Sequence, residues 1–257
     1  MSSGYTSIEQ YSRSRFSAPL SGGYEVSHDI YSRGTGAPVI LIQELPGIGE
    51  ETLRLSDRLS DAGFEVILPH LLGPIGRTSM VGNFARVFCM RREFHLFSAN
   101  RSSPIVDWLK ALCREIRDSR QVAGVGVIGM CLSGNFAISL IGDDSVLAAV
   151  ASQPAMPLHR QDALHMSPAE IACSRSALEH KGPMLALRFE QDRACSASRF
   201  QCIQDTFNDD GTERIRLETL PGKGHSVLTI DFVDQQGHPT SEALASVIGY
   251  FTRKLSP

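Results

Sequence analysis

The feature that most constrains this 257-residue chain is the stretch at residues 122–141, VAGVGVIGMCLSGNFAISLI. An almost unbroken apolar run passes through a corner of small residues at 129–134 and resumes as an apolar segment of helical length. Continuous apolar runs suit strands that are covered on both faces, and glycine permits a turn that a Cβ would obstruct. The stretch therefore predicts a buried strand, a tight turn and a buried helix.

The thiol of Cys131 stands at the tip of this turn. A reactive side chain at a strand-to-helix turn is exposed above the sheet, and N–H groups at the start of the new helix face developing negative charge. Cys131 is therefore a candidate nucleophile, with a buried structural cysteine as the alternative. The remaining cysteines lack this context, and we expect packing or surface thiols at Cys89, Cys113, Cys173, Cys195 and Cys202.

Composition excludes several classes of protein. The net charge of -3 and the absence of a long Lys/Arg cluster argue against nucleic acid as a partner. No apolar run reaches the roughly 20 residues that span a bilayer, and the N-terminus lacks the apolar middle of a secretory signal. The six cysteines include no CxxC pair, so neither a disulfide framework nor a metal site is expected. These features favour a reduced, cytoplasmic setting.

Apolar runs alternate with amphipathic segments along the chain. Strands are expected at 24–32, 38–43, 64–69, 146–152, 184–189 and 215–220, in addition to the run before the corner. Helices are expected around 55–62, from Ser103-Pro104 through Ile116, and at 196–207 and 241–255. This alternation predicts an α/β fold with a mostly parallel, doubly covered sheet in a single domain, residues 1–257.

Three segments do not fit this alternation. The Ser/Arg-rich residues 1–20 are expected to form a loose lead-in. Residues 70–102 and 153–180 look irregular and are longer than simple connections. Long loops of this kind often bind ligands or cover a site, so both segments are candidate lids or binding loops.

Four polar side chains come just after predicted strands: Glu44, Cys131, Asp192 and His225. Ligands of parallel sheets bind at the carboxyl ends of the strands, so these side chains could share one site. Each has an ordinary alternative, because Glu44 could be a solvated loop acid and His225 a loop histidine.

Other acids could also orient the imidazole of His225. Glu190, Asp205 and Asp231 compete with Asp192, which alone sits immediately after a strand between Cys131 and the histidine.

Four segments together resemble the dienelactone hydrolase family of the α/β-hydrolase superfamily. They are QELPG at 43–47, GMCLSG at 129–134, EQD at 190–192 and GKGHS at 222–226. The resemblance implies that Cys131 is the nucleophile, that His225 is the base and later the proton donor, and that Asp192 orients His225.

The resemblance also implies roles for residues around Cys131, His225 and Asp192. Glu44 would be an extra carboxylate that switches the thiol between a protected and a reactive state. The backbone N–H groups of Leu132 and Leu45 would form the oxyanion hole. No cofactor is implied, and the substrate would be a small ester or lactone.

Two positions depart from the family pattern. Ser133 stands where many members have glycine, and Thr229 stands where dienelactone-cleaving members have an arginine that grips the substrate carboxylate. Arg86, Arg91 or Arg92 could supply such a clamp, or could belong to a solvated face.

The resulting hypothesis is a cofactor-free hydrolase that forms an acyl-enzyme on Cys131, acting as a monomer or weak homodimer. The alternative is a non-hydrolytic member of the fold that binds a ligand or senses oxidants through the same thiol. Epoxide and halide chemistry is disfavoured, because such relatives carry a carboxylate in place of Cys131.

Overall fold

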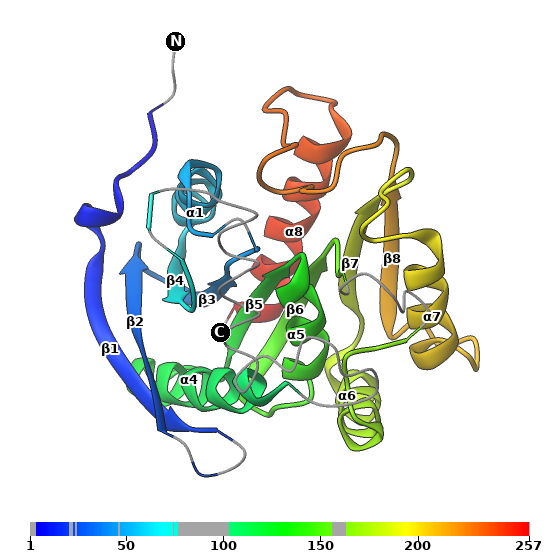
Figure 1. The fold of residues 1–257 in the computed structure, drawn as a ribbon, viewed down its shortest axis with the longest axis horizontal. Coiled ribbons are helices and arrows are strands. Elements are labelled where there is room, and N and C mark those ends of the chain that lie inside the picture. Colours follow the sequence, from blue (N-terminus) through cyan, green and yellow to red (C-terminus); the bar gives the residue numbers. More distant parts are fainter. Residues whose placement is uncertain are drawn as a thin grey trace.

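The structure is a computed structural model that describes residues 4–20, 23, 25–45, 47–73, 75–76, 103–155 and 163–256. Its described residues form one eight-stranded sheet with the order β1-β2-β4-β3-β5-β6-β7-β8. The strands are β1 (Ser12–Pro19), β2 (Glu25–Arg33), β3 (Ala37–Ile42), β4 (Phe64–His70), β5 (Val125–Met130), β6 (Val146–Ser152), β7 (Met184–Phe189) and β8 (Ile215–Leu220). From β4 to β8 all neighbouring strands are parallel, whereas β2 runs antiparallel to both β1 and β4. The predicted α/β-hydrolase architecture is confirmed, with β1 and β8 at opposite edges (Figure 1).

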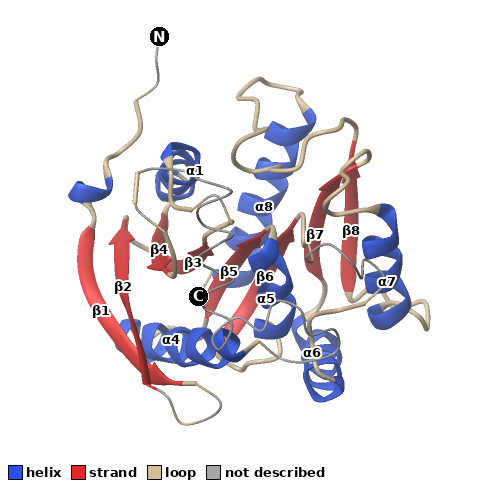
Figure 2. Cartoon of the chain, in the orientation of Figure 1, coloured by secondary structure: helices blue, strands red, loops and turns tan. Residues whose placement is uncertain are grey.

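Helices cover both faces of the sheet (Figure 2). They are α1 (Glu50–Asp61), α4 (Pro104–Arg120), α5 (Leu132–Leu140), α6 (Pro168–Lys181), α7 (Ala197–Phe207) and α8 (Pro239–Leu255). Alternate residues of one buried strand face different layers. In β3, Val39 and Leu41 pack in the cluster that holds α1 and α8, whereas Ile40 and Ile42 pack in the cluster that holds α4 to α7.

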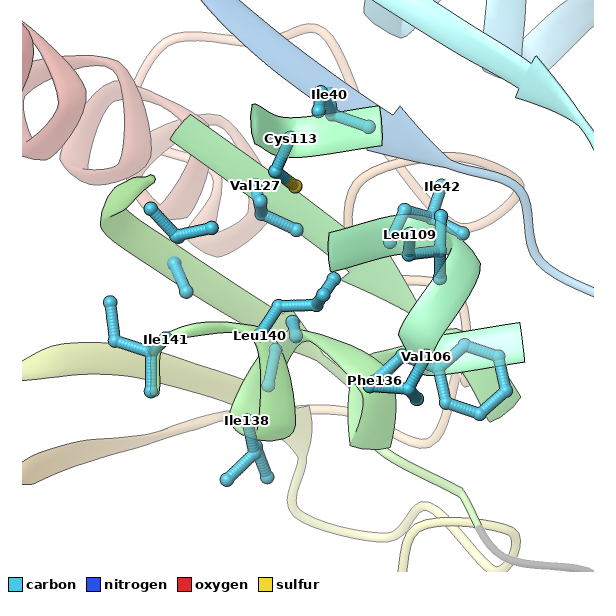
Figure 3. Close-up of a cluster of buried hydrophobic side chains, with 14 of the residues drawn as sticks. Ile40, Ile42, Val106, Leu109, Cys113, Val127, Phe136, Ile138, Leu140 and Ile141 are labelled. Carbon is cyan, nitrogen blue, oxygen red and sulfur yellow. The ribbon is translucent and has the colours of Figure 1, made fainter. Parts of the chain in front are cut away.

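The second of these clusters joins α4 and α5 to the centre of the sheet. Figure 3 shows Leu109 and Cys113 of α4 and Phe136 of α5 among the side chains of the central strands, including Val127 of β5. Both faces of β3 and β5 are buried, which explains why their sequences are continuous apolar runs rather than alternating ones.

The strand order creates a switch point between β3 and β5. These strands are neighbours in the sheet, but the helix after β3 (α1) packs on one face and the helix after β5 (α5) packs on the other. A crevice forms outside the carboxyl ends of strands where connections diverge in this way. Glu44 and Cys131 follow these two strands, so the topology brings both to the crevice.

Two predictions about irregular segments were wrong. Residues 1–20 do not form a loose lead-in, because Ser12–Pro19 pairs along its whole length with β2. Residues 153–180 are not irregular throughout, because α6 occupies Pro168–Lys181. Strand β1 is mostly exposed, and α6 buries only Ser174 and Leu178. Neither segment therefore has the periodic apolar residues from which strands and helices are predicted.

Most of the candidate lid at 70–102 lies outside the described residues, as do residues 156–162 of the second candidate. Among the helices that the structure describes, none is long and apolar enough to cross a membrane.

Candidate active site

Cys131 sits on a strained turn between β5 and α5. Its backbone has φ 56° and ψ -122°, a conformation that a residue with a Cβ rarely adopts and that costs about 1–3 kcal/mol. Three backbone hydrogen bonds hold the turn: its N–H donates to Ser152 (3.0 Å), and its carbonyl accepts from Gly134 (3.0 Å) and Ala155 (3.1 Å). The turn is thus fixed by β6 and by the chain that follows β6.

Small residues allow the strand and helix to approach each other at this turn. A Cβ on Gly129 would lie 2.1 Å from the carbonyl oxygen of Ser133, so no larger residue fits without backbone movement. The Ser133 hydroxyl accepts the N–H of Met130 (2.8 Å), and its own proton is within reach of the carbonyls of Met130 (2.9 Å) and Ile42 (3.2 Å). This hydroxyl therefore joins the turn to the end of β3.

His225 and Asp192 meet across the loops that follow β8 and β7. The Nδ1 atom of His225 lies 2.7 Å from Asp192 Oδ2, and the Asp192 side chain is 1% exposed. The other carboxylate oxygen, Oδ1, accepts the N–H groups of Ala194 (2.8 Å) and Cys195 (3.0 Å). A carboxylate held in this way favours the tautomer with the proton on Nδ1, which leaves Nε2 to accept a proton.

The electrostatics of His225 couple it to Cys131. Burial alone lowers the pKa of His225, but hydrogen bonding and charge from Asp192 and from the Cys131 thiol outweigh burial and raise the pKa to about 10. The Nε2 atom is buried and has no nitrogen or oxygen partner among the described residues, so Cys131 is the group whose hydrogen bonding acts on it. The imidazole therefore has one nitrogen held by Asp192 and the other coupled to the thiol.

Of the competing acids, none bonds to the ring. Glu190 is exposed, and Asp205 accepts a hydrogen bond from Gln201. Asp231 does contact His225, but through the backbone N–H and not through the imidazole.

Glu44 is a buried carboxylate rather than a solvated loop acid, with 2% of the residue exposed. Thr229 donates to its Oε1 (2.5 Å) and Ser226 donates to its Oε2 (2.9 Å). Burial raises the pKa of Glu44, and the two hydroxyls and the charge of His225 partly oppose this effect. Sequence reasoning missed both hydroxyl partners, although Ser226 directly follows His225.

A narrow pocket brings Glu44 together with both predicted oxyanion residues. It is lined by Gln43, Glu44, Leu45, Leu71, Leu72, Leu132, Ser133 and Phe136. Leu132 is the first residue of α5, so its N–H has no acceptor within the helix. The three candidate arginines, Arg86, Arg91 and Arg92, lie outside the described residues.

Residues 30–254 match the model of the dienelactone hydrolase family. The chain belongs to the dienelactone hydrolase family. This is a family of hydrolases, as the four sequence segments predicted. No curated protein sequence matches the chain.

Solved structures of the same fold include dienelactone hydrolases and esterases. The dienelactone hydrolase from Anabaena variabilis has a TM-score of 0.59 at 16% identity, covering 96% of this chain and 100% of the other. A cold-adapted esterase from an Arctic intertidal metagenomic library has a TM-score of 0.59 at 17% sequence identity, and the match covers 100% of this chain and 99% of the esterase. An esterase from Pyrococcus furiosus has a TM-score of 0.60 at 14% sequence identity, and the match covers 97% of this chain and 95% of the esterase. At sequence identities this low, the similarity to these structures shows the fold and nothing more.

Relative to the dienelactone hydrolase family, the two departures have clear local structures. Ser133 fits the close approach at the turn and adds bonds that a glycine could not make. Thr229 is fully buried, and its hydroxyl is committed to Glu44. The position of the expected arginine therefore presents no charge to a ligand.

Proposed function

We propose that this protein hydrolyses a small ester or lactone through an acyl-enzyme on Cys131, without a cofactor. The observation that carries the proposal is the state of His225. Its Nδ1 is bonded to Asp192 at 2.7 Å, its Nε2 has no nitrogen or oxygen partner among the described residues, and its pKa responds to the Cys131 thiol. This is the arrangement that an activated nucleophile needs.

In the proposed reaction, the thiol proton resides on Nε2 of His225 before the attack, as the raised pKa of His225 favours, and Cys131 Sγ attacks the carbonyl carbon as a thiolate. The tetrahedral intermediate collapses: the bond from carbon to the leaving oxygen breaks, and the alcohol leaves with the proton from His225. Water then gives a proton to His225 and attacks the thioester. The carbon–sulfur bond breaks, releasing the acid, and the sulfur regains its proton from the imidazole.

The oxyanion in both halves of the reaction would be held by the N–H groups of Leu45 and Leu132. Support comes from their lining one pocket and from the position of Leu132 at a helix start. Removing one such donor typically costs about 2.7–4 kcal/mol of transition-state stabilisation. Two backbone donors would therefore matter as much as the activation of the thiol.

Glu44 would be the carboxylate that switches the thiol between protected and reactive states. Its place in the pocket lining supports this role, as does the burial that raises its pKa and makes it a better proton acceptor.

Charge around the site is mixed. Leu45, Leu71, Leu72, Leu132 and Phe136 make the small pocket beside Glu44 mostly apolar. A separate, larger hollow is lined by Asp192 and His225 together with Arg193 and Lys223, so two cations lie near the proposed base. Thr229, which is buried against Glu44, supplies no cation. The cytoplasmic setting, the monomer or weak homodimer, and the absence of nucleic-acid and membrane partners stay predictions.

The test uses p-nitrophenyl acetate and mass spectrometry. Cys131→Ala should reduce hydrolysis to the background rate and abolish the acetylated species seen on the wild-type protein. Cys131→Ser should be slower than wild type, because the site suits a thiol. Cys173→Ala, which removes an exposed cysteine on α6, is the matched control and should be unaffected.

Hydrolysis at the wild-type rate in Cys131→Ala would rule out the proposed nucleophile. The substrate class is tested separately with a matched pair of esters, one neutral and one carrying a carboxylate on the acyl chain. A higher kcat/KM for the carboxylated ester would indicate that Arg193 and Lys223 take part in binding the acyl chain.

A further inference from the structure

The loop that carries His225 is closed by a single carboxylate. Asp231 Oδ2 accepts the backbone N–H groups of His225 (2.8 Å) and Ser226 (2.9 Å). In the reverse direction, the N–H of Asp231 donates to the carbonyl of Ser226 (3.1 Å). Asp231 therefore fixes the backbone at the start of the loop from its other end.

The glycine before the histidine makes room for this carboxylate. A Cβ on Gly224 would lie 2.7 Å from Asp231 Cγ and 2.8 Å from Asp231 Oδ2. The same Cβ would also lie 2.8 Å from the ring of Phe189. The absence of a side chain at Gly224 is thus a physical condition for the contact between Asp231 and the His225 N–H.

Three side chains of the closed loop point to two acceptors in different parts of the sheet. His225 reaches Asp192, which follows β7, while Ser226 and Thr229 reach Glu44, which follows β3. A shift of the loop backbone would disturb both contacts together. A misplacement of about 1 Å can lower a rate by roughly 100-fold, so the position of this backbone matters for catalysis.

We propose that Asp231 is the positioning residue of this site. Its carboxylate holds the backbone of His225 and Ser226 so that the imidazole faces Cys131 while the loop hydroxyls hold Glu44. Asp231 is not among the residues that line the pocket, and it acts on the site through the backbone it holds and through its charge, which raises the pKa of Glu44. The inference rests on the proposed function only in taking His225 as the base for Cys131.

Three variants separate the position of the carboxylate from its charge. Asp231→Ala removes the acceptor. Asp231→Asn keeps an oxygen at the same place without the charge, and Asp231→Glu keeps the charge but moves the oxygens by one methylene. For p-nitrophenyl acetate we expect the Ala and Glu variants to lose about 10- to 100-fold in kcat with little change in KM. The Asn variant should stay within about 5-fold of wild type, because its oxygen still accepts both N–H groups.

A second measurement follows alkylation of Cys131 by iodoacetamide against pH, with the site of labelling identified by mass spectrometry. In the Ala and Glu variants the alkylation profile should differ from that of the wild-type protein, because the imidazole no longer faces Cys131. In the Asn variant the profile should match the wild-type one. Asp234→Ala is the matched control: this acid is on the same stretch, 77% exposed and paired with Arg58, and both readouts should be unchanged.

Two results would overturn the proposal. One is an Ala or Glu variant that matches wild type in kcat and in the alkylation profile. The other is the reverse order, with Glu close to wild type and Asn impaired, because that order would make charge rather than position the cause. If the wild-type protein hydrolyses no ester, the proposed function fails, but the alkylation profiles still decide the role of Asp231. If the Ala variant does not fold, the comparison of Asn with Glu decides it.

Discussion

Glu44 and Thr229 are separated by 185 positions in the sequence and are joined by a hydrogen bond of 2.5 Å. Together with the bond from Ser226 it ties the loop after β3 to the loop after β8. These strands stand four places apart in the sheet order, so no ladder hydrogen bond connects them directly. The buried carboxylate is therefore a cross-link between the two ends of the site.

This cross-link predicts the effect of Thr229→Val. Valine keeps the shape of the buried side chain but removes the donor, so Glu44 loses one of two hydrogen bonds in a desolvated place. We expect a loss of about 1–3 kcal/mol in the free energy of unfolding, measured by urea denaturation. The pKa of Glu44 should rise further, since the hydroxyl lowers it in the wild-type protein.

Thr252→Val is the control for this substitution. Thr252 is exposed on α8 and donates only to a carbonyl of its own helix, so its replacement should change stability by less than about 0.5 kcal/mol. Equal losses of unfolding free energy in Thr229→Val and Thr252→Val would show that the hydrogen bond to Glu44 does not stabilise the fold.

The pKa of His225 predicts how stability depends on pH. In the folded protein it is about 10, above the 6.5 of an ordinary histidine. Between these values the folded protein holds a proton that the unfolded chain has released. The stabilisation is complete below pH 6.5 and is lost as the pH rises to about 10. We therefore expect the difference in unfolding free energy between wild type and His225→Gln to shrink over this range.

The measurement is a series of urea denaturation curves at pH 6, 8 and 10. Asp192→Asn removes the strongest interaction that raises the pKa, so it should flatten the dependence in the same way. His180→Gln, which alters an exposed histidine on α6, should follow the wild-type curve. Parallel curves for wild type and His225→Gln would contradict the predicted coupling.

The close approach at the nucleophile turn predicts a large effect of Gly129→Ala. The new Cβ would meet the Ser133 carbonyl at 2.1 Å, and a backbone atom cannot move away as a flexible side chain can. We expect destabilisation of at least about 2 kcal/mol and slower alkylation of Cys131.

Gly249→Ala supplies the contrast. This glycine lies inside α8, where a Cβ would meet only the end of Arg253 at 3.4 Å, so alanine should stabilise the protein by up to about 1 kcal/mol. A Gly129→Ala protein as stable as wild type would mean that the turn is less tightly packed than the structure indicates.

The sequence predicted those parts of the site that follow buried strands. The strands at 146–152, 184–189 and 215–220 have the expected bounds, because burial on the sheet leaves an apolar run that is visible in the residues. Asp192 and His225 come directly after two strands, and the sheet order determines that they meet. Their pairing could therefore be inferred without coordinates.

The partners of Glu44 could not be predicted in this way. Ser226, Thr229 and Asp231 are ordinary loop residues whose roles depend on how one loop folds back on itself and which other loop it meets. For α6 a signal did exist: Ser167 and Glu170 form a capping box around Pro168. It was missed because the helix has no apolar stripe to draw attention to it.

The divergence of α1 and α5 on opposite faces of the sheet has a practical consequence for engineering. The hollow that gathers Glu44 and Cys131 arises from the order of the strands and from the first residues after β4 and β6, among them Leu72 in the pocket lining and Ala155 at the Cys131 turn, beyond which the inserted stretches continue. Chimeras that exchange those inserted stretches between relatives should therefore change which molecules enter the hollow, while Glu44 and Cys131 keep their positions.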